Sequence, residues 1–336
     1  MKQTDGIISS PLAGTDSEEG GDAGVDVELR TATIAATEHG VRLDRALVEM
    51  VPEFSRSYLQ QLIEAGNVTL SGQGVRKASQ RVKAGDVCSV ELRPTPQSQA
   101  FTPQSMALNV VFEDAHLMVI DKPAGLVVHP APGNWSGTLL NGLLAYDRAF
   151  TTVPRAGIVH RLDKDTSGLM VVARTRTVMD ALVQAIAART VSRQYLALAH
   201  HTWRGVPTTS VELPIGRDPR NRLRMAVVDL ERTPGKPAKT DMVLLANAHD
   251  GCFVRCILHT GRTHQIRVHM ASLGHPLVGD VVYGGTQIPC MARQALHACK
   301  LAFSHPVTGE SLVFTAQPPA DFADLLSEWG LRYNSA

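Results

Sequence analysis

The stretch GIVHRLDKDTSGLMVVAR, residues 157–174, carries a polar loop crowded with charge directly into a run of apolar residues. The apolar half has the length and composition of a buried β-strand. Reactive side chains are common on loops at the edge of a rigid sheet, and this loop presents the carboxylates of Asp163 and Asp165. On composition alone, a plain loop in which either aspartate accepts from backbone amides is the favoured interpretation.

Short β-rich runs and a few helices surround this stretch between residues 105 and 332. We expect strands at 108–113, 117–121, 169–174, 194–199, 240–247, 252–259 and 311–314, and helices at 138–147, 177–189 and 321–329. Strands and helices do not alternate regularly, as they would in a doubly wound parallel sheet. The pattern therefore predicts an α+β domain with a mixed, mainly antiparallel β-sheet.

Residues 40–93 predict a separate, small α-α-β domain. Apolar residues at 43, 46, 47 and 50 have helical spacing, and Pro52 ends that helix. Ser55 is a good N-cap for a second helix, which Gly66 ends. Short strand-like pieces at 68–70 and 87–90 follow.

Two polar segments flank this small domain. Residues 1–35 are rich in Gly, Ser, Thr and Asp and poor in large apolar side chains, so we expect a disordered arm. Its acidic residues are Asp5, Asp16, Glu18, Glu19, Asp22, Asp26 and Glu28. Residues 94–104 contain three prolines among polar residues and predict an extended, semi-stiff linker.

Composition limits the class of protein. Lys plus Arg total 33 and Asp plus Glu total 32, a balance that does not by itself indicate a nucleic-acid partner. Because the acidic arm holds many of the carboxylates, the remainder of the chain is basic. No secretory signal and no apolar run of membrane-spanning length is found, and the five cysteines lack the spacing of a disulfide framework. We therefore expect a cytoplasmic protein with reduced thiols.

The small domain resembles an S4 RNA-binding domain. The resemblance rests on RLD at 42–44, SRS at 55–57, LIEAGNV at 62–68 and GD at 85–86, whereas the turn that is usually Val-Asn-Gly reads Leu-Ser-Gly at 70–72. It implies that Arg42, Arg56 and Lys77 contact RNA. From charge alone, a solvated basic surface is the alternative.

The loop HRLDKDTSG at 160–168 resembles the signature of the RluA family of pseudouridine synthases. The longer string PRAGIVHRLDKD at 154–165 resembles the RluD-like branch of that family, which modifies large-subunit rRNA. The resemblance implies that Asp163 is the catalytic residue and that His160 and Arg161 contact the RNA. Arg161 would take the place of the flipped base, a role that suits a planar guanidinium.

Two further segments match the same family. DKPAGLVVHP at 121–130 resembles its first motif, and Lys122 either contacts a phosphate or is a surface lysine. RQYLAL at 193–198 alternates as a strand does, which places Tyr195 on the same face as Arg193 and Ala197. A half-buried core tyrosine is the simpler interpretation, but the resemblance makes Tyr195 the active-site tyrosine that packs against the target base.

The segment LHTGRTHQIRVH at 258–269 completes the resemblance. It implies that Arg262 pairs with Asp163 and that Ile266 supplies apolar packing near the base. The charge argument is independent of the family, because a bidentate arginine holds a carboxylate in one geometry. GHPLVGDVVYG at 274–284 also matches the family, and we interpret it as scaffold.

A zinc site is the competing interpretation of the same region, since Cys252, Cys256, His259 and His264 have metal-ligand chemistry. The two cysteines alternate on one face of an expected strand, where buried thiols act as small hydrophobic groups. His259 then points to the opposite face. We therefore expect no metal.

Together the segments predict an enzyme that isomerises uridine in RNA, with large-subunit rRNA or a pre-ribosomal particle as partner and the decoding-bridge hairpin, helix 69, as target. The uridine must leave the stack before its N1–C1′ bond is reachable. Asp163 would attack covalently or remove the C2′ proton, and these routes stay open. Tyr195 would stack on the uracil, and transfer of the C5 proton to it is also open. We expect a monomer without a cofactor; other RNA targets and a non-catalytic assembly factor are the alternatives.

Overall fold

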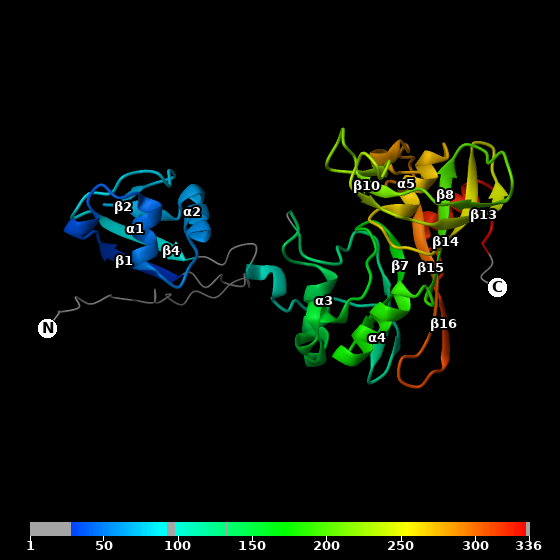
Figure 1. Cartoon of the computed structure of the whole chain (residues 1–336), viewed down its shortest axis with the longest axis horizontal. Helices are drawn as coiled ribbons and strands as arrows, with labels where there is room; N and C mark the ends of the chain where they lie inside the picture. Colours follow the sequence, from blue (N-terminus) through cyan, green and yellow to red (C-terminus); the bar gives the residue numbers. More distant parts are fainter. Residues whose placement is uncertain (1–27, 93–97, 132, 334–336) are drawn as a thin grey trace, which may run out of the picture. The chain divides into compact units, whose positions relative to one another are not determined.

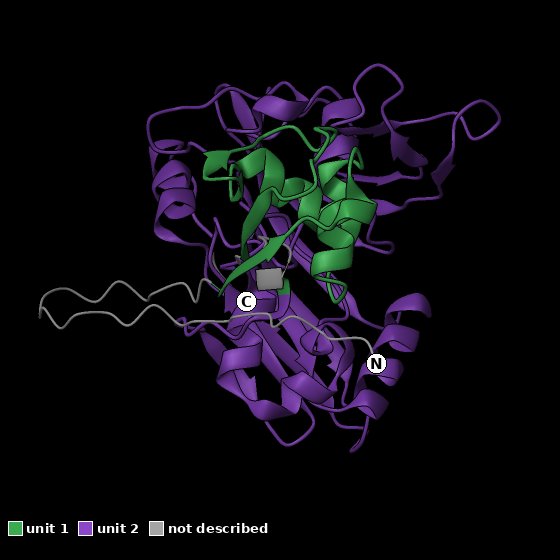
Figure 2. Ribbon diagram, turned by 90° about the vertical axis from the view of Figure 1, so that its left-hand side faces the viewer, with its two compact units in different colours: residues 1–100 green, residues 101–336 purple. Residues whose placement is uncertain are grey.

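The fold is described from a computed structural model that covers residues 28–92, 98–131 and 133–333. The chain divides into two compact units, Met1–Ala100 and Phe101–Ala336, which Figure 2 shows in different colours. Among the described residues, no helix is long and apolar enough to cross a membrane.

The first unit has the expected two helices and small strands. Its elements are β1 (Glu28–Thr33), α1 (Leu43–Met50), α2 (Arg56–Ala65), β2 (Val68–Leu70), β3 (Gln73–Gly74) and β4 (Val87–Leu92), with strands in the order β1-β4-β2-β3. The Ser55 hydroxyl accepts from the Tyr58 amide at 3.3 Å, and Gly66 ends α2 at a left-handed φ of 87°. Leu47 and Ile63 bring the two helices into one core with the sheet.

The predicted arm is wrong over its last residues. Residues 28–33 form β1, which pairs antiparallel with β4, from Glu28 opposite Leu92 to Thr33 opposite Val87. Ile34 is buried in the core of this unit. The backbone ladder and this one apolar side chain order a segment that composition assigned to the arm. Residues 1–27 lie outside the described part.

The predicted linker is wrong over its second half. Residues 98–101 form a short 3-10 helix, η2, and the side-chain amide of Asn141 donates to the Thr102 carbonyl at 2.9 Å. The Gln104 amide in turn donates to the Asn141 carbonyl at 3.0 Å. Residues 102–104 are therefore bonded to helix α3 (Leu139–Tyr146) within the second unit. Residues 93–97 lie outside the described part.

A mixed, mainly antiparallel sheet forms the centre of the second unit, as predicted (Figure 1). It has nine strands in the order β5-β6-β7-β15-β8-β14-β13-β9, with β16 on β15. Its strands are β5 (Val110–Glu113), β6 (Leu117–Lys122), β7 (Ser167–Ala173), β8 (Ser192–His200), β9 (Thr208–Val211), β13 (Thr240–Asn247), β14 (Gly251–Leu258), β15 (Leu296–Ser304) and β16 (Ser311–Thr315). The pair β7–β15 is parallel and the other pairs are antiparallel. A smaller sheet holds β10 (Ile215–Arg217), β11 (Met225–Val227) and β12 (Gly235–Lys236).

Helices cover both faces of the large sheet. They are α3 (Leu139–Tyr146), α4 (Arg176–Ala187), α5 (Gln265–Ser272) and α6 (Ala320–Glu328), with the 3-10 turns η3 (Arg148–Thr152), η4 (Pro154–Gly157) and η5 (Val281–Tyr283). Met118 of β6 packs in the core cluster that contains α3, whereas its neighbour Leu117 packs in the cluster that contains α4. Every residue of β7 is buried because both of its faces are covered. This rigid strand carries the 157–166 loop.

Candidate active site

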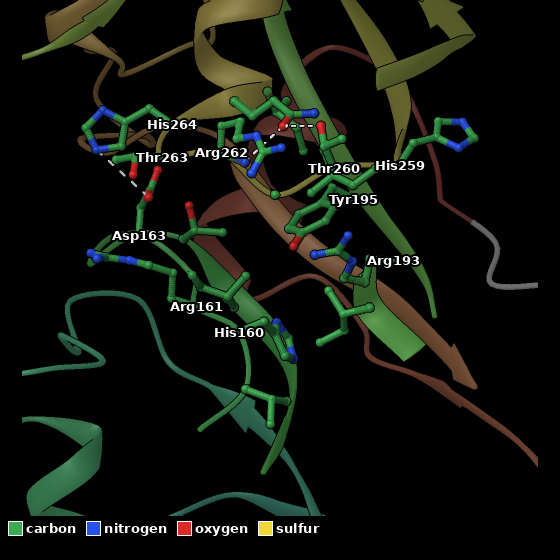
Figure 3. A pocket seen from close by; sticks show the side chains of 18 of the residues that line it. His160, Arg161, Asp163, Arg193, Tyr195, His259, Thr260, Arg262, Thr263 and His264 are labelled. Atoms are coloured by element: carbon green, nitrogen blue, oxygen red, sulfur yellow. Dashed lines mark hydrogen bonds and ion pairs between the residues drawn. The ribbon is translucent and has the colours of Figure 1, made fainter. Parts of the chain in front are cut away.

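One pocket of about 500 Å³ gathers most of the predicted site residues (Figure 3). Its walls come from the loop before β7, the start of β8, and the 258–267 segment that runs from the end of β14 into α5. This volume is typical of pockets that hold a small molecule, so a single flipped nucleoside is a suitable occupant. His160, Arg161, Asp163, Tyr195, Arg262 and Ile266 all line it.

Glycines fix the two ends of the Asp163 loop. Gly157 has a φ of 72°, and a Cβ there would lie 1.8 Å from the Ala173 carbonyl oxygen. Gly168 has a φ of 114°, and a Cβ there would lie 2.3 Å from the Ala298 carbonyl oxygen. No other residue fits these positions without displacing backbone. The loop is thus tied to β7 and β15.

Lys122 is neither a phosphate contact nor a surface lysine. Its side chain is buried, and Nζ donates to the carbonyls of Pro123 at 2.7 Å, Leu126 at 2.9 Å and Lys164 at 2.9 Å. Burial lowers the pKa of its ammonium to about 8. The prediction failed because the sequence shows a charged residue in a turn but not the three carbonyls that converge on it. Lys122 holds the backbone next to Asp163 in place.

Asp163 is paired with Arg267. Nη1 of Arg267 donates to Asp163 Oδ2 at 3.2 Å, while its Nε and Nη2 donate to both oxygens of Asp280 at 2.7 and 2.8 Å. The guanidinium also lies over the ring of Tyr283, 5.0 Å from the centroid. Burial alone would lower the pKa of Arg267, but the hydrogen bonds and charges of Asp280 and Asp163 raise it above its ordinary value. Arg267 is thus a fixed cation.

The predicted pairing of Arg262 with Asp163 is therefore wrong. Arg262 Nε donates to the Pro237 carbonyl at 3.0 Å, and its backbone amide donates to Gln265 Oε1 at 2.9 Å. The segment turns into helix α5 at Gln265, which directs the side chain of Arg267 to the carboxylate. Arg262 still lines the same pocket.

His264 is a site residue that the sequence analysis considered only as a metal ligand. It has a left-handed φ of 57°, and its Nε2 lies 3.9 Å from Asp163 Oδ1. The Tyr283 hydroxyl accepts from the Met225 amide at 3.0 Å and shares a hydrogen bond of 2.8 Å with His264 Nδ1. Burial lowers the pKa of His264, which favours the neutral ring, and its Nε2 faces the carboxylate.

Tyr195 and Ile266 form the apolar wall of the pocket. Tyr195 packs in the main core with Ala197, on the same face of β8, and its side chain is more deeply buried than predicted. Burial raises the pKa of Tyr195 to about 12, so it stays a neutral phenol at physiological pH. Ile266, in the first turn of α5, is buried in the same core cluster and lines the same pocket.

The predicted RNA contacts of the first unit have structural partners. Nη2 of Arg42 and of Arg56 lie 3.0 and 2.8 Å from Oδ2 of the buried Asp44. The hydrogen bonds of Arg42, Gln60 and Arg56 outweigh burial and hold the pKa of Asp44 well below its usual range. Both arginines remain about half exposed, and Lys77 is exposed. They stabilise the fold of this unit and keep surface that RNA can contact.

The described residues contain no group of three side chains that could hold a metal ion. Cys252 and Cys256 are buried in the main core, whereas Phe253 between them packs in another cluster on the opposite face. His259 Nε2 lies 2.6 Å from Asp241 Oδ2. These positions confirm the alternation that separates His259 from both cysteines.

Comparisons with known proteins agree with this geometry. A family model described as RNA pseudouridylate synthase matches residues 116–272, and the S4 domain model matches 41–88. The ribosomal large subunit pseudouridine synthase D of Neisseria meningitidis serogroup B is 47% identical over 300 residues, which cover 86% of this chain and 78% of that protein. This chain belongs to the RNA pseudouridylate synthase family. The protein of the same name from Escherichia coli O6:H1 is 42% identical over 311 residues, 88% of this chain and 93% of that protein.

A solved structure shows the same likeness. Human RNA pseudouridylate synthase domain containing 1 is 26% identical, with a TM-score of 0.51 over 65% of this chain and 86% of that chain. The chain is therefore an RNA pseudouridine synthase with an S4 domain before its catalytic unit, as the sequence predicted.

Proposed function

We propose that this enzyme converts uridines of large-subunit rRNA to pseudouridine, with Asp163 as its catalytic residue. The observation that carries the proposal is the carboxylate of Asp163, held in the pocket by Arg267 and facing the neutral His264. The two relatives described above, which carry the name of large-subunit enzymes, support the class of substrate.

The target uridine enters the pocket by base flipping, because its reacting atoms are not reachable within a stack. Arg161 is exposed and lines the pocket only two positions before Asp163. Its planar guanidinium can stack in the space that the base leaves. The S4 unit adds affinity and register through phosphate contacts of Arg42, Arg56 and Lys77.

Asp163 then acts at the sugar. In one route its carboxylate attacks C1′, and in the other it removes the C2′ proton, so that C1′ and C2′ become joined by a double bond. In both routes the electron pair of the N1–C1′ bond leaves with the base, which turns and bonds to C1′ through C5. Bonding of C5 displaces the Asp163 carboxylate from C1′ in the first route, and in the second route Asp163 returns the proton to C2′ as C5 bonds to C1′. C5 then loses its proton and N1 gains one. Arg267 orients the carboxylate through one hydrogen bond, which leaves Oδ1 on the side of His264.

Tyr195 acts as the stacking platform for uracil. A phenol with a pKa of about 12 is protonated and cannot accept the C5 proton at physiological pH. We therefore assign the final proton transfer to Asp163 or water, with Tyr195 fixing the plane of the base. Arg262, which lines the same pocket, contacts the RNA backbone rather than the carboxylate.

We further propose the helix 69 hairpin as the target, in free rRNA or a pre-ribosomal particle, and a cytoplasmic monomer that needs no cofactor. The test is tritium release from large-subunit rRNA that carries [5-³H]uridine, followed by mapping of the modified positions. Wild type should release tritium and Asp163→Asn should not, with RNA binding retained. Wild-type release from tRNA alone would refute the proposed substrate, and no release from any RNA would favour a binding factor.

A further inference from the structure

Two buried hydrogen-bond donors without partners line the pocket. Three buried side-chain nitrogens in the described part of the chain have no hydrogen-bond partner: His160 Nδ1, Arg193 Nε and Arg255 Nε. The first two belong to residues of the pocket wall, and the third does not. An unpaired buried donor costs about 1–3 kcal/mol, so two in one pocket indicate a ligand that satisfies them.

Arg193 is a buried cation without a counter-charge. Arg193 is 6% exposed. Within residues 28–92, 98–131 and 133–333, no carboxylate forms an ion pair with its guanidinium. It precedes Tyr195 by two positions on β8 and lies beside it in the pocket, while Asp163 lies on the other side (Figure 3). A Cβ on Gly261 would lie 2.9 Å from Arg193 Nη1, so the backbone at Gly261 lies against the guanidinium. Arg193 is therefore held in the pocket wall, next to Tyr195 and Gly261.

His160 adds a second donor of known tautomer. The Val171 amide donates to His160 Nε2 at 3.1 Å, which requires a lone pair on that nitrogen. Burial and the charge of Arg193 lower the pKa of His160 to about 3, so the ring is neutral at physiological pH. Its proton therefore lies on Nδ1, the atom without a partner. Arginine has no acceptor either, so these two side chains offer only donors.

We propose that Arg193 and His160 bind the carbonyl oxygens of the flipped uracil, and that Arg193 stabilises the negative charge that the base acquires as the N1–C1′ bond breaks. This inference rests on the proposed function, in which the uridine lies between Asp163 and Tyr195. The exposed arginines of the pocket are Arg155, Arg161 and Arg189. These three arginines can bind phosphates of the RNA backbone, which stays at the surface. The buried Arg193 and His160 contact the base instead.

The chemistry of cleavage requires such a cation in either route. The electron pair of the N1–C1′ bond passes to N1 and is delocalised onto the carbonyl oxygens. Neutral uracil can accept hydrogen bonds from both donors but does not neutralise the charge of Arg193, whereas the departing uracil anion does both. Arg193 is therefore complementary to the transition state. The same site discriminates against cytosine, whose 4-amino group would place a donor against donors.

The test is a double-mutant cycle between enzyme and base. Wild type and Arg193→Gln are compared in single-turnover assays on one RNA that carries uridine, 4-thiouridine or 2-thiouridine at the mapped target. Each rate is compared between the two enzymes on the same RNA, so the effect of sulfur on the leaving ability of the base cancels. Losing one buried oxyanion donor typically slows chemistry about 10²–10³-fold. We expect this loss on uridine and a loss at least about tenfold smaller on one thio-RNA, because sulfur is a poor acceptor.

Two controls separate this role from others. Thermal denaturation of Arg193→Gln should stay cooperative, and Arg193→Lys, which keeps the charge, should recover part of the rate. Arg189→Gln removes an exposed arginine of the same pocket and should weaken RNA affinity equally for all three bases.

The inference is overturned if Arg193→Gln weakens RNA affinity and lowers its salt dependence while the single-turnover rate is unchanged, since that is the behaviour of a phosphate contact. An equal loss on all three bases overturns it as well. Absence of wild-type turnover on any RNA refutes the proposed function and this inference together, which distinguishes the two failures.

Discussion

Asp280 anchors Arg267 on the side away from Asp163, and Asp280→Asn tests whether this second carboxylate positions the first. The side chains of Arg267 and Asp280 are 7% and 1% exposed. Breaking a buried ion pair by removing one partner costs about 3–5 kcal/mol. Asparagine keeps one acceptor but turns a donor toward the guanidinium, so we expect a loss of about 3 kcal/mol. A domain stable by about 5–15 kcal/mol remains folded after such a loss.

The activity should fall as well, because Arg267 released from Asp280 can pair with both oxygens of Asp163 and turn the carboxylate. A misplacement of about 1 Å costs about 10²-fold in rate. The measurements are urea denaturation and single-turnover tritium release at saturating enzyme. If Asp280→Asn lowers the free energy of unfolding but keeps the wild-type single-turnover rate, Asp280 does not position Asp163.

Asp147→Asn is the matched control. Asp147 also pairs with an arginine, Arg174, and its Oδ1 accepts from the Ala149 amide at 2.8 Å, away from the pocket. Its side chain is 30% exposed, so the expected loss is about 1 kcal/mol with an unchanged rate. Unchanged stability of Asp280→Asn would show instead that the buried pair contributes little.

Three further predictions follow from the same contacts. Arg267→Gln should lower the rate of tritium release at least ~10³-fold and Arg262→Gln less than ~10-fold, because only Arg267 is hydrogen-bonded to Asp163. A larger loss for Arg262→Gln would favour the pairing of Arg262 with Asp163 that the sequence predicted. Since the pKa of His160 is about 3 when folded and near 6.5 when unfolded, the unfolded chain binds the extra proton. Stability is therefore lost as pH falls below 6.5, by about 2 kcal/mol at pH 5, and His160→Asn should flatten the urea midpoint between pH 7 and 5. Gly168→Ala should cost more than ~2 kcal/mol because its Cβ meets backbone, whereas Gly40→Ala, with φ of 77° and open space, should cost about 1 kcal/mol; equal denaturation midpoints would refute this difference.

The elements that the sequence predicted best have local signals. Helix α2 starts at a Ser N-cap and ends at a left-handed Gly, and β6 and β13 are β-rich runs between turns. Helix α5 has no such signal, because residues 265–270 are buried on every side and show no amphipathic period. Strand β15 was missed for a similar reason, since burial on both faces removes the alternation that marks a strand.

Six of the predicted site residues line one pocket, but Lys122 does not, and the pairing of Asp163 with Arg262 is wrong. Asp163 lies in the loop before β7 and Tyr195 lies near the start of β8, and the sequence marks both strands, whereas Ile266 lies in α5, which the sequence does not mark. The choice between Arg262 and Arg267 depends on the turn into α5 and on Asp280, thirteen positions beyond Arg267. Neither is a local property of the sequence.

The arginines of the pocket have different roles because they differ in burial and in partners, while Asp163 is the single carboxylate among the residues that line it. Arg161 and its exposed neighbours face solvent, where a phosphate contact is screened by salt and carries no base information. Arg267 is occupied by two carboxylates, so it orients Asp163 and has little charge left for RNA. Arg193 is buried without an anion, and its counter-charge arises only when the base departs. Exposed arginines therefore contribute affinity for RNA, Arg267 positions Asp163, and Arg193 stabilises the leaving base. The burial and existing partners of each guanidinium decide which of these roles it has.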